Sequence, residues 1–524
     1  MSRSTLVRLS SFMSLLMAMI IPGGAEEDTA AMVYRTHCAS CHGADRLGGQ
    51  GPALIPQSLK RLRKKPARKV IAAGRPATQM PAFADILNEK QLAEIVSYIF
   101  EPLVQVPEWG RAQIEASRTV IRKGTPELHG PRFDADPRNL FVVVEAGDHH
   151  ATILDGDKFS SIHRFKTRFA LHGGPKFSPD GRYVFFASRD GWVSRFDLWS
   201  LEVTAEIRAG INTRNVAISN TGKYLAVANY LPHTLVILRA FDLSLVKIFD
   251  VRNRHGATSR VSAVYQAPQR SSFVAALKDV SEIWEISTDP NSRPVYEGFV
   301  HNYKPGHVEA LSIQKGLFSR RRIQVEQPLD DFFFDQSYRH LIGSSRKDND
   351  AVVVNLNVGR PVARIDLPGF PHLGAGTTWT WRGRRVMAAP HLKNNLVSVI
   401  DMQDWSVIKR IPTKGPGFFM RSHERSRYAW VDVFFGPNRD LMHVIDKQTL
   451  EIAKTLRPEP GKTSAHVEFD KYGRHALVSI WDIDGAIVVY DANTLNEIKR
   501  IPMSKPSGKY NVQNKIKFSE GTSH

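Results

Sequence analysis

The first residues of the chain that are capable of chemistry are two thiols and an imidazole. Cys38 and Cys41 are separated by two residues, and His42 follows directly. Two thiols at this spacing add across the two vinyl groups of one haem, and the adjacent imidazole binds its iron. These are the only two cysteines among 524 residues, so none remains for a disulfide or a zinc site. The motif therefore predicts a covalently bound haem c.

A methionine further along the chain is the expected sixth ligand of this iron. Met80 has a soft thioether, which raises the reduction potential of the iron and suits electron transfer. Residues 88–100 then form an amphipathic stretch, the pattern of a terminal helix. The alternative is that Met80 fills the core and that His37 or water binds the iron. Together these features predict a small all-α class I cytochrome c domain over 26–105.

The N-terminal residues have the pattern of a secretory signal. Arg3 and Arg8 precede an apolar stretch at 12–21, and small residues follow at 22–25. The apolar stretch is far shorter than the ~20 residues of a membrane span, and no other run in the chain is long enough. A retained N-terminal anchor is the alternative. We expect cleavage after residues 1–25, no membrane span and a soluble periplasmic protein, because covalent haem c is attached outside the bacterial cytoplasm.

The rest of the chain repeats one pattern of a turn, an apolar strand and two further strands. The pattern returns about every 41 to 50 residues, the period of a four-stranded propeller blade. Its copies begin near Phe133, Phe177, Ile218, Gln266, Phe334, Trp381, His423 and Phe469. Eight copies predict an all-β eight-bladed propeller over 131–524, joined to the cytochrome domain by a linker at 106–130. Seven blades is the alternative.

The positive charge of the chain limits its possible partners. The formal net charge is +19, and the basic residues are spread over the repeats without an aromatic stripe. Nucleic acid is therefore not expected as a partner. The densest basic run, RKKPARK at 63–69, predicts a solvated surface or, as a second interpretation, a docking site for an acidic redox partner. Inside a propeller funnel, arginine and lysine suit a ligand with several carboxylates, which arginine binds bidentately.

A class I cytochrome c joined to an eight-bladed propeller resembles the cytochrome cd1 family, over nearly the whole mature chain. The motifs that carry the resemblance are SRDG at 188–191 with FDLW at 196–199, TR at 213–214, ANY at 228–230, VSIW at 478–481 and PSGKYNV at 506–512. Family members hold haem c in the small domain and non-covalent haem d1 in the propeller funnel. The resemblance implies that His172 is the proximal ligand of the haem d1 iron. It also implies that Arg189, Arg214 and Tyr230 hold the haem d1 carboxylates, the alternative being hydrogen bonds between blades.

One departure from the family's pattern bears on the reaction. Nitrite reductases of this family carry two distal histidines; the stretch PHLGAGTTWTW at 371–381 keeps the first as His372 and has Trp381 at the expected position of the second. An indole is only a donor and does not titrate near neutral pH, unlike an imidazole. Efficient nitrite reduction is therefore not expected. His466 would instead reach the distal face of the iron and cap it, the alternative being a surface-loop histidine.

The resemblance favours the branch of the family that acts on the cofactor itself. The last step of haem d1 biosynthesis converts a propionate of dihydro-haem d1 to an acrylate, with loss of two electrons and two protons. A propeller that binds haem d1 or dihydro-haem d1 and keeps haem c as an electron outlet suits this dehydrogenation. His372 is the expected base, because the unperturbed pKa of histidine is ~6.5. Tyr510 would orient the carboxylate or relay a proton, and His466 would complete the site.

The expected partners follow from this reaction. They are a soluble periplasmic electron acceptor, the other proteins of haem d1 biosynthesis, and nitrite reductase as the recipient of the product. The alternatives are a nitrite reductase that has replaced one histidine, and a haem d1 carrier without catalysis. Haem c argues against a carrier, which needs no electron outlet. A dehydrogenase of an unrelated small molecule would need a different ligand set from the one around His172.

Overall fold

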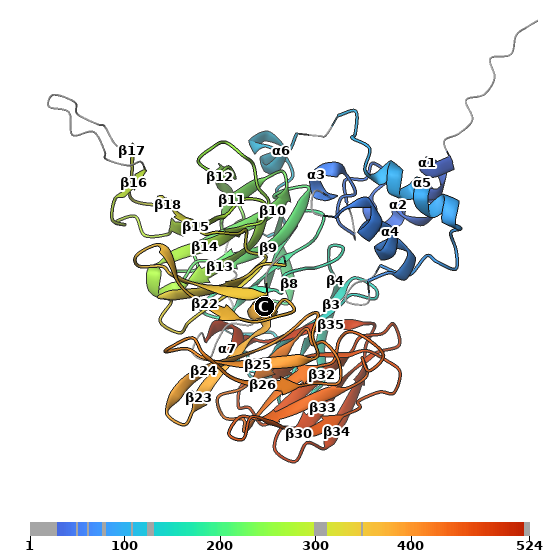
Figure 1. The fold of residues 1–524 in the computed structure, drawn as a ribbon, viewed down its shortest axis with the longest axis vertical. Coiled ribbons are helices and arrows are strands. Elements are labelled where there is room, and N and C mark those ends of the chain that lie inside the picture. The colour runs from blue at the N-terminus through green and yellow to red at the C-terminus, as the bar shows by residue number, and fades with distance from the viewer. Residues whose placement is uncertain are drawn as a thin grey trace, which may run out of the picture.

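The computed structural model describes residues 29–48, 51–59, 62–75, 80–105, 108–122, 130–297, 312–346 and 349–517. The secretory signal expected at 1–25 lies outside them. Helices come first along the chain, and strands follow from residue 119 onward. Figure 1 shows the first helices, in blue, gathered to one side of the strands. Among the described residues, no helix has both the length and the apolar character needed to cross a membrane.

The N-terminal helices form their own apolar core. They are α1 (Thr29–His37), α2 (Ala39–His42), α3 (Pro56–Leu59), α4 (Lys64–Ala73) and α5 (Glu89–Ile99). α5 begins at a capping box, in which Asn88 and Gln91 each accept the backbone N–H of the other. Its apolar face packs on α1 and α4, and every residue of this core lies between Val33 and Phe100. The cytochrome domain therefore has a core without propeller residues.

The strands of the described residues form eight antiparallel blade sheets, seven of four strands and one to which a fifth strand is added, and a separate two-stranded sheet. Four of these blades follow one another along the chain. The first two consist of β5 (Lys176–Phe177), β6 (Tyr183–Ala187), β7 (Trp192–Asp197) and β8 (Glu202–Arg208), and of β9 (Asn212–Ile218), β10 (Tyr224–Leu231), β11 (Thr234–Arg239) and β12 (Leu245–Asp250). The next two consist of β13 (Val261–Ala267), β14 (Ser272–Leu277), β15 (Glu282–Ser287) and β18 (Arg320–Gln324), and of β19 (Asp331–Phe334), β20 (His340–Ser344), β21 (Asp350–Asn355) and β22 (Arg360–Asp366).

Three further blades follow in chain order. They are β23 (Thr377–Trp381), β24 (Arg384–Pro390), β25 (Leu396–Asp401) and β26 (Val407–Pro412); β27 (Met420–Ser422), β28 (Tyr428–Asp432), β29 (Met442–Asp446) and β30 (Glu451–Leu456); and β31 (Ser464–Phe469), β32 (His475–Ile480), β33 (Ala486–Asp491) and β34 (Glu497–Pro502). β16 (Val295–Glu297) and β17 (Ser312–Gln314) form a separate hairpin. The predicted eight-bladed propeller is confirmed, and the seven-bladed alternative is wrong.

The eighth blade joins the two ends of the propeller. β35 (Pro506–Asn511) comes from the C-terminal end and pairs antiparallel with β2 (Phe141–Glu145), with Tyr510 opposite Val142. β3 (His150–Leu154) and β4 (Ser161–Lys166) complete this sheet, and α7 (Val512–Ile516) follows β35. The innermost strand of the first blade is therefore the last strand of the chain. This pairing closes the ring, and the sequence analysis did not anticipate it.

The depth of each strand explains the sequence pattern of a blade. Blades pack face to face, so both faces of the inner strands are covered and most of their residues are buried. The third strand of the last complete blade, β33, is buried along nearly all its length, whereas the outermost strand, β34, is exposed along nearly all of it. The long apolar runs and the polar runs between them thus belong to different depths of one sheet.

The segment between the domains is attached to the propeller. Residues 108–122, which the sequence analysis placed in a linker, form α6 (Arg111–Ala116) and β1 (Thr119–Val120). β1 pairs with β8 and adds a fifth strand to that blade. The indole N–H of Trp109 donates to the carbonyl of Arg208 at 2.9 Å. The connection is therefore fixed along the outer edge of a blade.

The closing strand supplies the first test. Asn511, at its end, donates to Oδ1 of Asn139 at 3.1 Å and accepts the N–H of Asn514. Replacing Asn511 with Ala removes both bonds, one of which caps the N-terminus of α7, so we expect a loss of about 0.5–2 kcal/mol in the free energy of unfolding. Oδ1 of Asn139 keeps the backbone N–H of Lys471 as a donor. Denaturant unfolding measures this loss. The exposed Asn493→Ala is the control and should change little; equal effects would contradict this role of the closing strand.

Candidate active site

The haem-attachment residues lie at the start of the cytochrome domain. α2 carries Cys41 and His42, and Cys38 precedes it as the N-cap residue. Nδ1 of His42 lies 2.7 Å from the carbonyl oxygen of Pro52, so Nδ1 donates and Nε2 keeps the lone pair that binds iron. A Cβ on Gly51 would lie 2.4 Å from the ring of His42, so only glycine fits there. Burial lowers the pKa of His42, which favours the neutral, ligating imidazole.

The segment that carries Met80 is held against the end of α4. The N–H of Arg75 donates to the carbonyl of Met80 at 3.0 Å. Gly74 has φ +69°, and a Cβ there would lie 2.8 Å from the same carbonyl oxygen. Met80 is half-buried and packs on the same apolar core as Cys38. Its placement fits the sixth ligand of haem c, which stays a prediction.

The cytochrome domain contacts the propeller directly. Arg260 Nη1 donates to the carbonyl of Ser58, at the end of α3, at 2.9 Å. An apolar cluster joins the two domains beside this bond and consists of Leu47, Ala53 and Ile55 with Ile211 and Leu231. Arg260 also lies 5.5 Å from the ring centroid of Tyr230. The loop after the haem-attachment motif therefore packs on the blade that carries Tyr230.

His172 and Arg214 come from neighbouring blades and meet inside the propeller. His172 Nδ1 donates to the carbonyl of Arg214 at 2.7 Å, and the Arg214 guanidinium lies 3.0 Å from the same nitrogen. Burial, and then the charges of Arg189 and Arg214, hold the pKa of His172 well below its usual value. His172 is therefore a neutral imidazole whose Nε2 carries the lone pair that binds a metal. The Arg214 guanidinium lies 3.4 Å from this Nε2, so the arginine side chain must move aside when a metal binds. The structure thus brings this predicted ligand together with two of the predicted carboxylate-binding residues.

Tyr230, on β10, is surrounded by positive charge. Lys278 Nζ lies 5.5 Å from its ring centroid, the same distance as Arg260. Burial alone would raise the pKa of Tyr230, but the charges of Lys278 and of three arginines lower it to about 7. The arginines are Arg189, Arg214 and Arg260. Such a cluster suits an anion with several carboxylates.

Lys176 adds a cation that the sequence analysis did not single out. It lies four residues after His172 and donates to the carbonyl of Gly173 at 3.2 Å. Burial, and then the charge of Arg214, lower its pKa to about 8. In the sequence it is a single lysine before a turn, and such lysines usually lie on the surface, so it was not selected as a site residue.

His372 forms a pair with a carboxylate. Its Nδ1 donates to the carbonyl of Phe418, and its Nε2 lies 3.8 Å from Oδ2 of Asp331. That oxygen also accepts the N–H of Gly374 at 2.7 Å, in the turn η2 (Leu373–Ala375). Nε2 is thus left as the acceptor nitrogen of the ring, and it faces the carboxylate of Asp331. Sequence reasoning missed Asp331, because an acidic residue at the start of an apolar strand had no motif around it.

The other two predicted catalytic residues lie in one aromatic cluster with His372. The ring centroids of His466 and Tyr510 are 5.2 Å apart, and that of Phe419 is 4.9 Å from His466. Phe418 in turn lies 4.5 Å from His372. His466 is only 7% exposed and lies on β31, so the surface-loop alternative is wrong. The predicted residues from three blades therefore meet through two phenylalanines.

Two buried donor or acceptor atoms in this cluster lack a hydrogen-bond partner among the described residues. They are Nδ1 of His466 and the indole Nε1 of Trp481. Both rings contact Phe419, at 4.9 and 6.1 Å between centroids. Buried polar atoms without partners are rare, so each is a candidate contact for a bound group. With neutral imidazoles for iron and cations for carboxylates, the residues fit an iron tetrapyrrole.

The interpretation of Trp381 was wrong. Trp381 ends β23, and its indole N–H donates to the carbonyl of Gln448 at 2.8 Å in a partly exposed position. β23 has five residues, each about 3.3 Å long, and Trp381 lies at the end of this strand that is farther from the loop of His372. The rings that contact His372 in the described part of the chain are Phe418 and Phe419. The argument against a second distal histidine therefore rests on these phenylalanines, which do not titrate.

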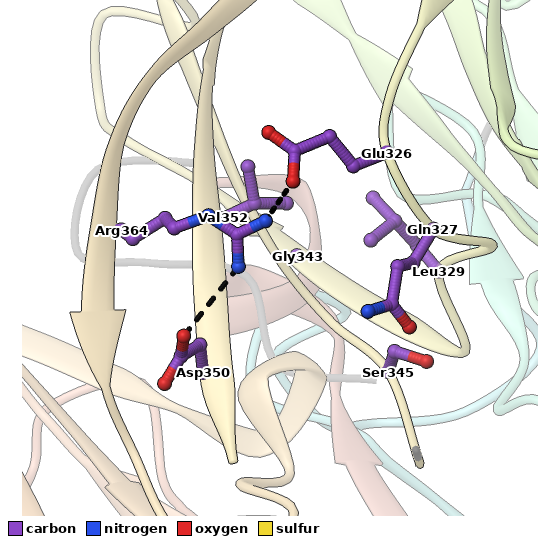
Figure 2. A pocket seen from close by; sticks show the side chains of 8 residues that line it. All are labelled: Glu326, Gln327, Leu329, Gly343, Ser345, Asp350, Val352 and Arg364. Atoms are coloured by element: carbon purple, nitrogen blue, oxygen red, sulfur yellow. Dashed lines mark hydrogen bonds and ion pairs between the residues drawn. The ribbon is translucent and has the colours of Figure 1, made fainter. Parts of the chain in front are cut away.

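A pocket elsewhere on the propeller contains none of the predicted site residues (Figure 2). Arg364 reaches across it and pairs with Glu326 and, at 3.4 Å, with Asp350. Its one arginine is already paired with both carboxylates, so it offers no cation for the carboxylates of a ligand.

The chain belongs to the family described as Cytochrome D1 heme domain, which it matches over residues 135–299 and 295–515. Residues 25–99 match the family described as Cytochrome C oxidase, cbb3-type, subunit III. The resemblance to the cytochrome cd1 family, and the order of a cytochrome c domain followed by a propeller, are therefore confirmed.

Two curated relatives and one solved structure are similar over nearly the whole chain. "Dihydro-heme d1 dehydrogenase" of Pseudomonas aeruginosa is 53% identical over 500 residues, which cover 95% of this chain and 97% of that protein. "Nitrite reductase" of Stutzerimonas stutzeri is 24% identical over 548 residues, 93% of each chain. The solved structure "Dihydro-heme d1 dehydrogenase NirN in complex with DHE" is 52% identical, with a TM-score of 0.78, and covers 93% of this chain and 100% of that one.

The charge around Tyr230 supplies the second test. In the protein without bound tetrapyrrole, we expect one tyrosine to ionise near pH 7, protonated below and phenolate above, because the surrounding cations stabilise the anion. The NMR signal of ring-labelled tyrosine, followed with pH, measures this. Tyr230→Phe should abolish the titration. Tyr265→Phe should keep it, since burial raises the pKa of Tyr265; no tyrosine titrating below about pH 9 would contradict the cluster.

Proposed function

We propose that this protein is a periplasmic dihydro-haem d1 dehydrogenase, which converts a propionate of dihydro-haem d1 to an acrylate in the last step of haem d1 biosynthesis. The observation that carries the proposal is the identity of 53%, over 95% of the chain, with a protein of that name. The aromatic cluster that contains His372, His466 and Tyr510 also supports it. The nitrite reductase relative is far less similar, and phenylalanines face His372.

The propeller residues would bind the substrate by its iron and its carboxylates. His172 and His466 are the proposed axial ligands, from two different blades. Arg189, Arg214 and Tyr230 are the proposed partners of the carboxylates, and the neutralisation of their mutual repulsion on binding favours a polyanionic substrate. In this arrangement the protein holds the macrocycle without a covalent bond, so that the product is able to leave.

The reaction breaks two C–H bonds of the propionate and forms one carbon–carbon double bond. Nε2 of His372 accepts a proton from the side chain, and Asp331 stabilises the imidazolium that forms. Burial raises the pKa of Tyr510, so its phenol stays protonated and donates a hydrogen bond to the propionate carboxylate. The substrate's own iron would take one electron and haem c the other, and the second proton would pass to water, which balances the two electrons and two protons lost. Haem c, held by Cys38, Cys41 and His42 with Met80, supplies that one-electron outlet.

The proposed partners act at different surfaces. A soluble periplasmic electron acceptor would take electrons from the cytochrome domain, where the basic stretch at 63–69 lies largely exposed. Other proteins of haem d1 biosynthesis would supply the substrate, and nitrite reductase would receive the product. The periplasm is the proposed compartment, because covalent haem c is attached there and nitrite is reduced there.

The decisive test is anaerobic incubation of the purified haem c protein with dihydro-haem d1. We expect the tetrapyrrole to lose two hydrogens by mass while haem c is reduced in step, because the reaction removes two electrons and two protons. Absorption spectra follow both events. Tight binding without conversion would leave a carrier as the function, and failure to bind would contradict the proposal.

The base gives a further prediction. His372→Ala should lower the turnover by about 10²–10⁴-fold, the usual contribution of a general base, with dihydro-haem d1 still bound. Asp331→Asn should lower it less, because it leaves Nε2 in place and removes only the stabilising charge. Stopped-flow reduction of haem c measures both.

A second histidine–carboxylate pair provides the matched control. His340 Nδ1 lies 2.9 Å from Asp335, in a turn away from the site residues. His340→Ala and Asp335→Asn should leave turnover unchanged. A normal turnover in His372→Ala would remove this residue from the mechanism.

A further inference from the structure

The guanidinium of Arg260 joins the cytochrome domain to the propeller. Arg260 directly precedes β13 and is only 3% exposed. Its Nε and Nη2 donate to the two carboxylate oxygens of Asp279, at 2.9 and 2.8 Å. Its Nη1 donates to the carbonyl of Ser58, in α3 of the cytochrome domain, at 2.9 Å. One planar group thus binds a propeller carboxylate and a cytochrome carbonyl at the same time.

Both partners of Arg260 suit a cation that fixes position. The last four carbonyls of a helix have no partner within it and carry a partial negative charge, and the carbonyl of Ser58 is one of these. Asp279 neutralises the guanidinium, and both side chains are 4% exposed. A buried ion pair adds little net stability compared with apolar residues of the same volume. The pair therefore points to a role in placing the two domains rather than in stabilising one of them.

The apolar contact beside this bond is small. Its buried residues are Leu47, Ala53 and Ile55 of the cytochrome domain with Ile211 and Leu231 of the propeller, and Leu103 and Trp109 of the connecting segment pack against them. Domains joined by a limited contact area move relative to each other unless further contacts hold them. Apolar contacts are also non-directional. The charge-assisted bond from Arg260 supplies the direction that this contact lacks.

The contact lies between the two proposed redox sites. On the cytochrome side, the docked loop includes Pro52, whose carbonyl accepts the Nδ1–H of the haem ligand His42 at 2.7 Å. On the propeller side, Leu231 follows Tyr230 at the end of β10, and the Arg260 guanidinium lies 5.5 Å from the Tyr230 ring centroid. The docked loop therefore connects the iron ligand of haem c with the carboxylate-binding edge of the propeller site.

We propose that Arg260 is a positioning residue that holds residues 51–58 of the cytochrome domain on the blade of Tyr230, and so fixes haem c beside the bound tetrapyrrole for electron transfer. One electron leaves the tetrapyrrole and reduces the ferric iron of haem c to the ferrous state. The rate of such a step falls steeply as the two groups move apart. The inference rests on the proposed function, since it takes haem c as the electron outlet and Tyr230 as a partner of the substrate carboxylates.

The test removes the bond to Ser58 by Arg260→Gln in the full-length haem c protein. Without ligand, hydrogen exchange followed by mass spectrometry should be faster at residues 51–59, because the docked loop opens more often. With haem d1 bound, flash photoreduction of haem c starts electron transfer between the two groups. We expect its rate to fall by about 10- to 100-fold, as for reacting groups that lose a fixed geometry. The reduction potential of haem c should not change, because Arg260 lies outside the core of the cytochrome domain.

The propeller offers a matched control for a merely structural effect. Arg270 donates to both oxygens of Glu285, at 2.7 and 3.1 Å, and to the carbonyl of Leu356 in the neighbouring blade at 3.2 Å. Arg270→Gln should lower stability and leave electron transfer and the exchange at 51–59 unchanged. Arg260→Lys keeps a cation for Asp279 but loses the planar fork that holds two partners. It should also slow electron transfer, and it decides if Arg260→Gln does not fold.

The outcomes separate this inference from the proposed function. Electron transfer at the wild-type rate in the Arg260 variants would overturn the positioning role, with or without faster exchange. Equal slowing in Arg270→Gln would overturn it as well, because any loss of stability would then be sufficient. Conversion of dihydro-haem d1 is measured separately. A wild type that transfers the electron and does not convert this substrate would contradict the proposed function alone.

Discussion

The pairing of β35 with β2 is the interaction on which the rest of the structure depends. It closes the ring of blades, and it brings a strand from the C-terminal end into the first blade. That strand carries Lys509 and Tyr510, which meet His466 from the preceding blade. Without this closure the last blade would lack a neighbour, and His466 would lose its contacts with the phenol of Tyr510 and the buried amine of Lys509. The site is therefore a product of the closed ring and not of any single blade.

The interior of the propeller combines a surplus of positive charge with neutral histidines. Four cations lower the pKa of Tyr230, whereas burial, and then the charges of Arg189 and Arg214, hold the pKa of His172 well below its usual value. The cations contribute to both effects, because positive charges in a buried region repel further protons from their titratable neighbours. A ligand with several carboxylates relieves that repulsion and meets imidazoles already in the ligating form. The same charges thus favour both the binding of a ligand's carboxylates and the neutral, metal-binding form of the imidazoles.

The sequence predicted the features that depend on local spacing. The Cys38–His42 motif, the helix over 88–100 and the eight repeats need only nearby residues, and the structure contains all of them. Trp381 was misplaced, because spacing along a motif does not show at which end of a strand a side chain lies. Asp331 and Lys509 were missed, because ionisable residues inside buried strands gain meaning only from partners in other blades. His466 was found through the family's pattern, whereas its backbone conformation depends on contacts that no local sequence records.

The self-contained core of the cytochrome domain has a consequence for the order of assembly. All its residues lie within the first hundred positions, and the two haem-binding thiols are among the earliest of them. The propeller, by contrast, is incomplete until the last strand has been synthesised, because its first blade waits for β35. A chain that is synthesised from its N-terminus therefore presents these thiols before the strand that closes the ring has been made.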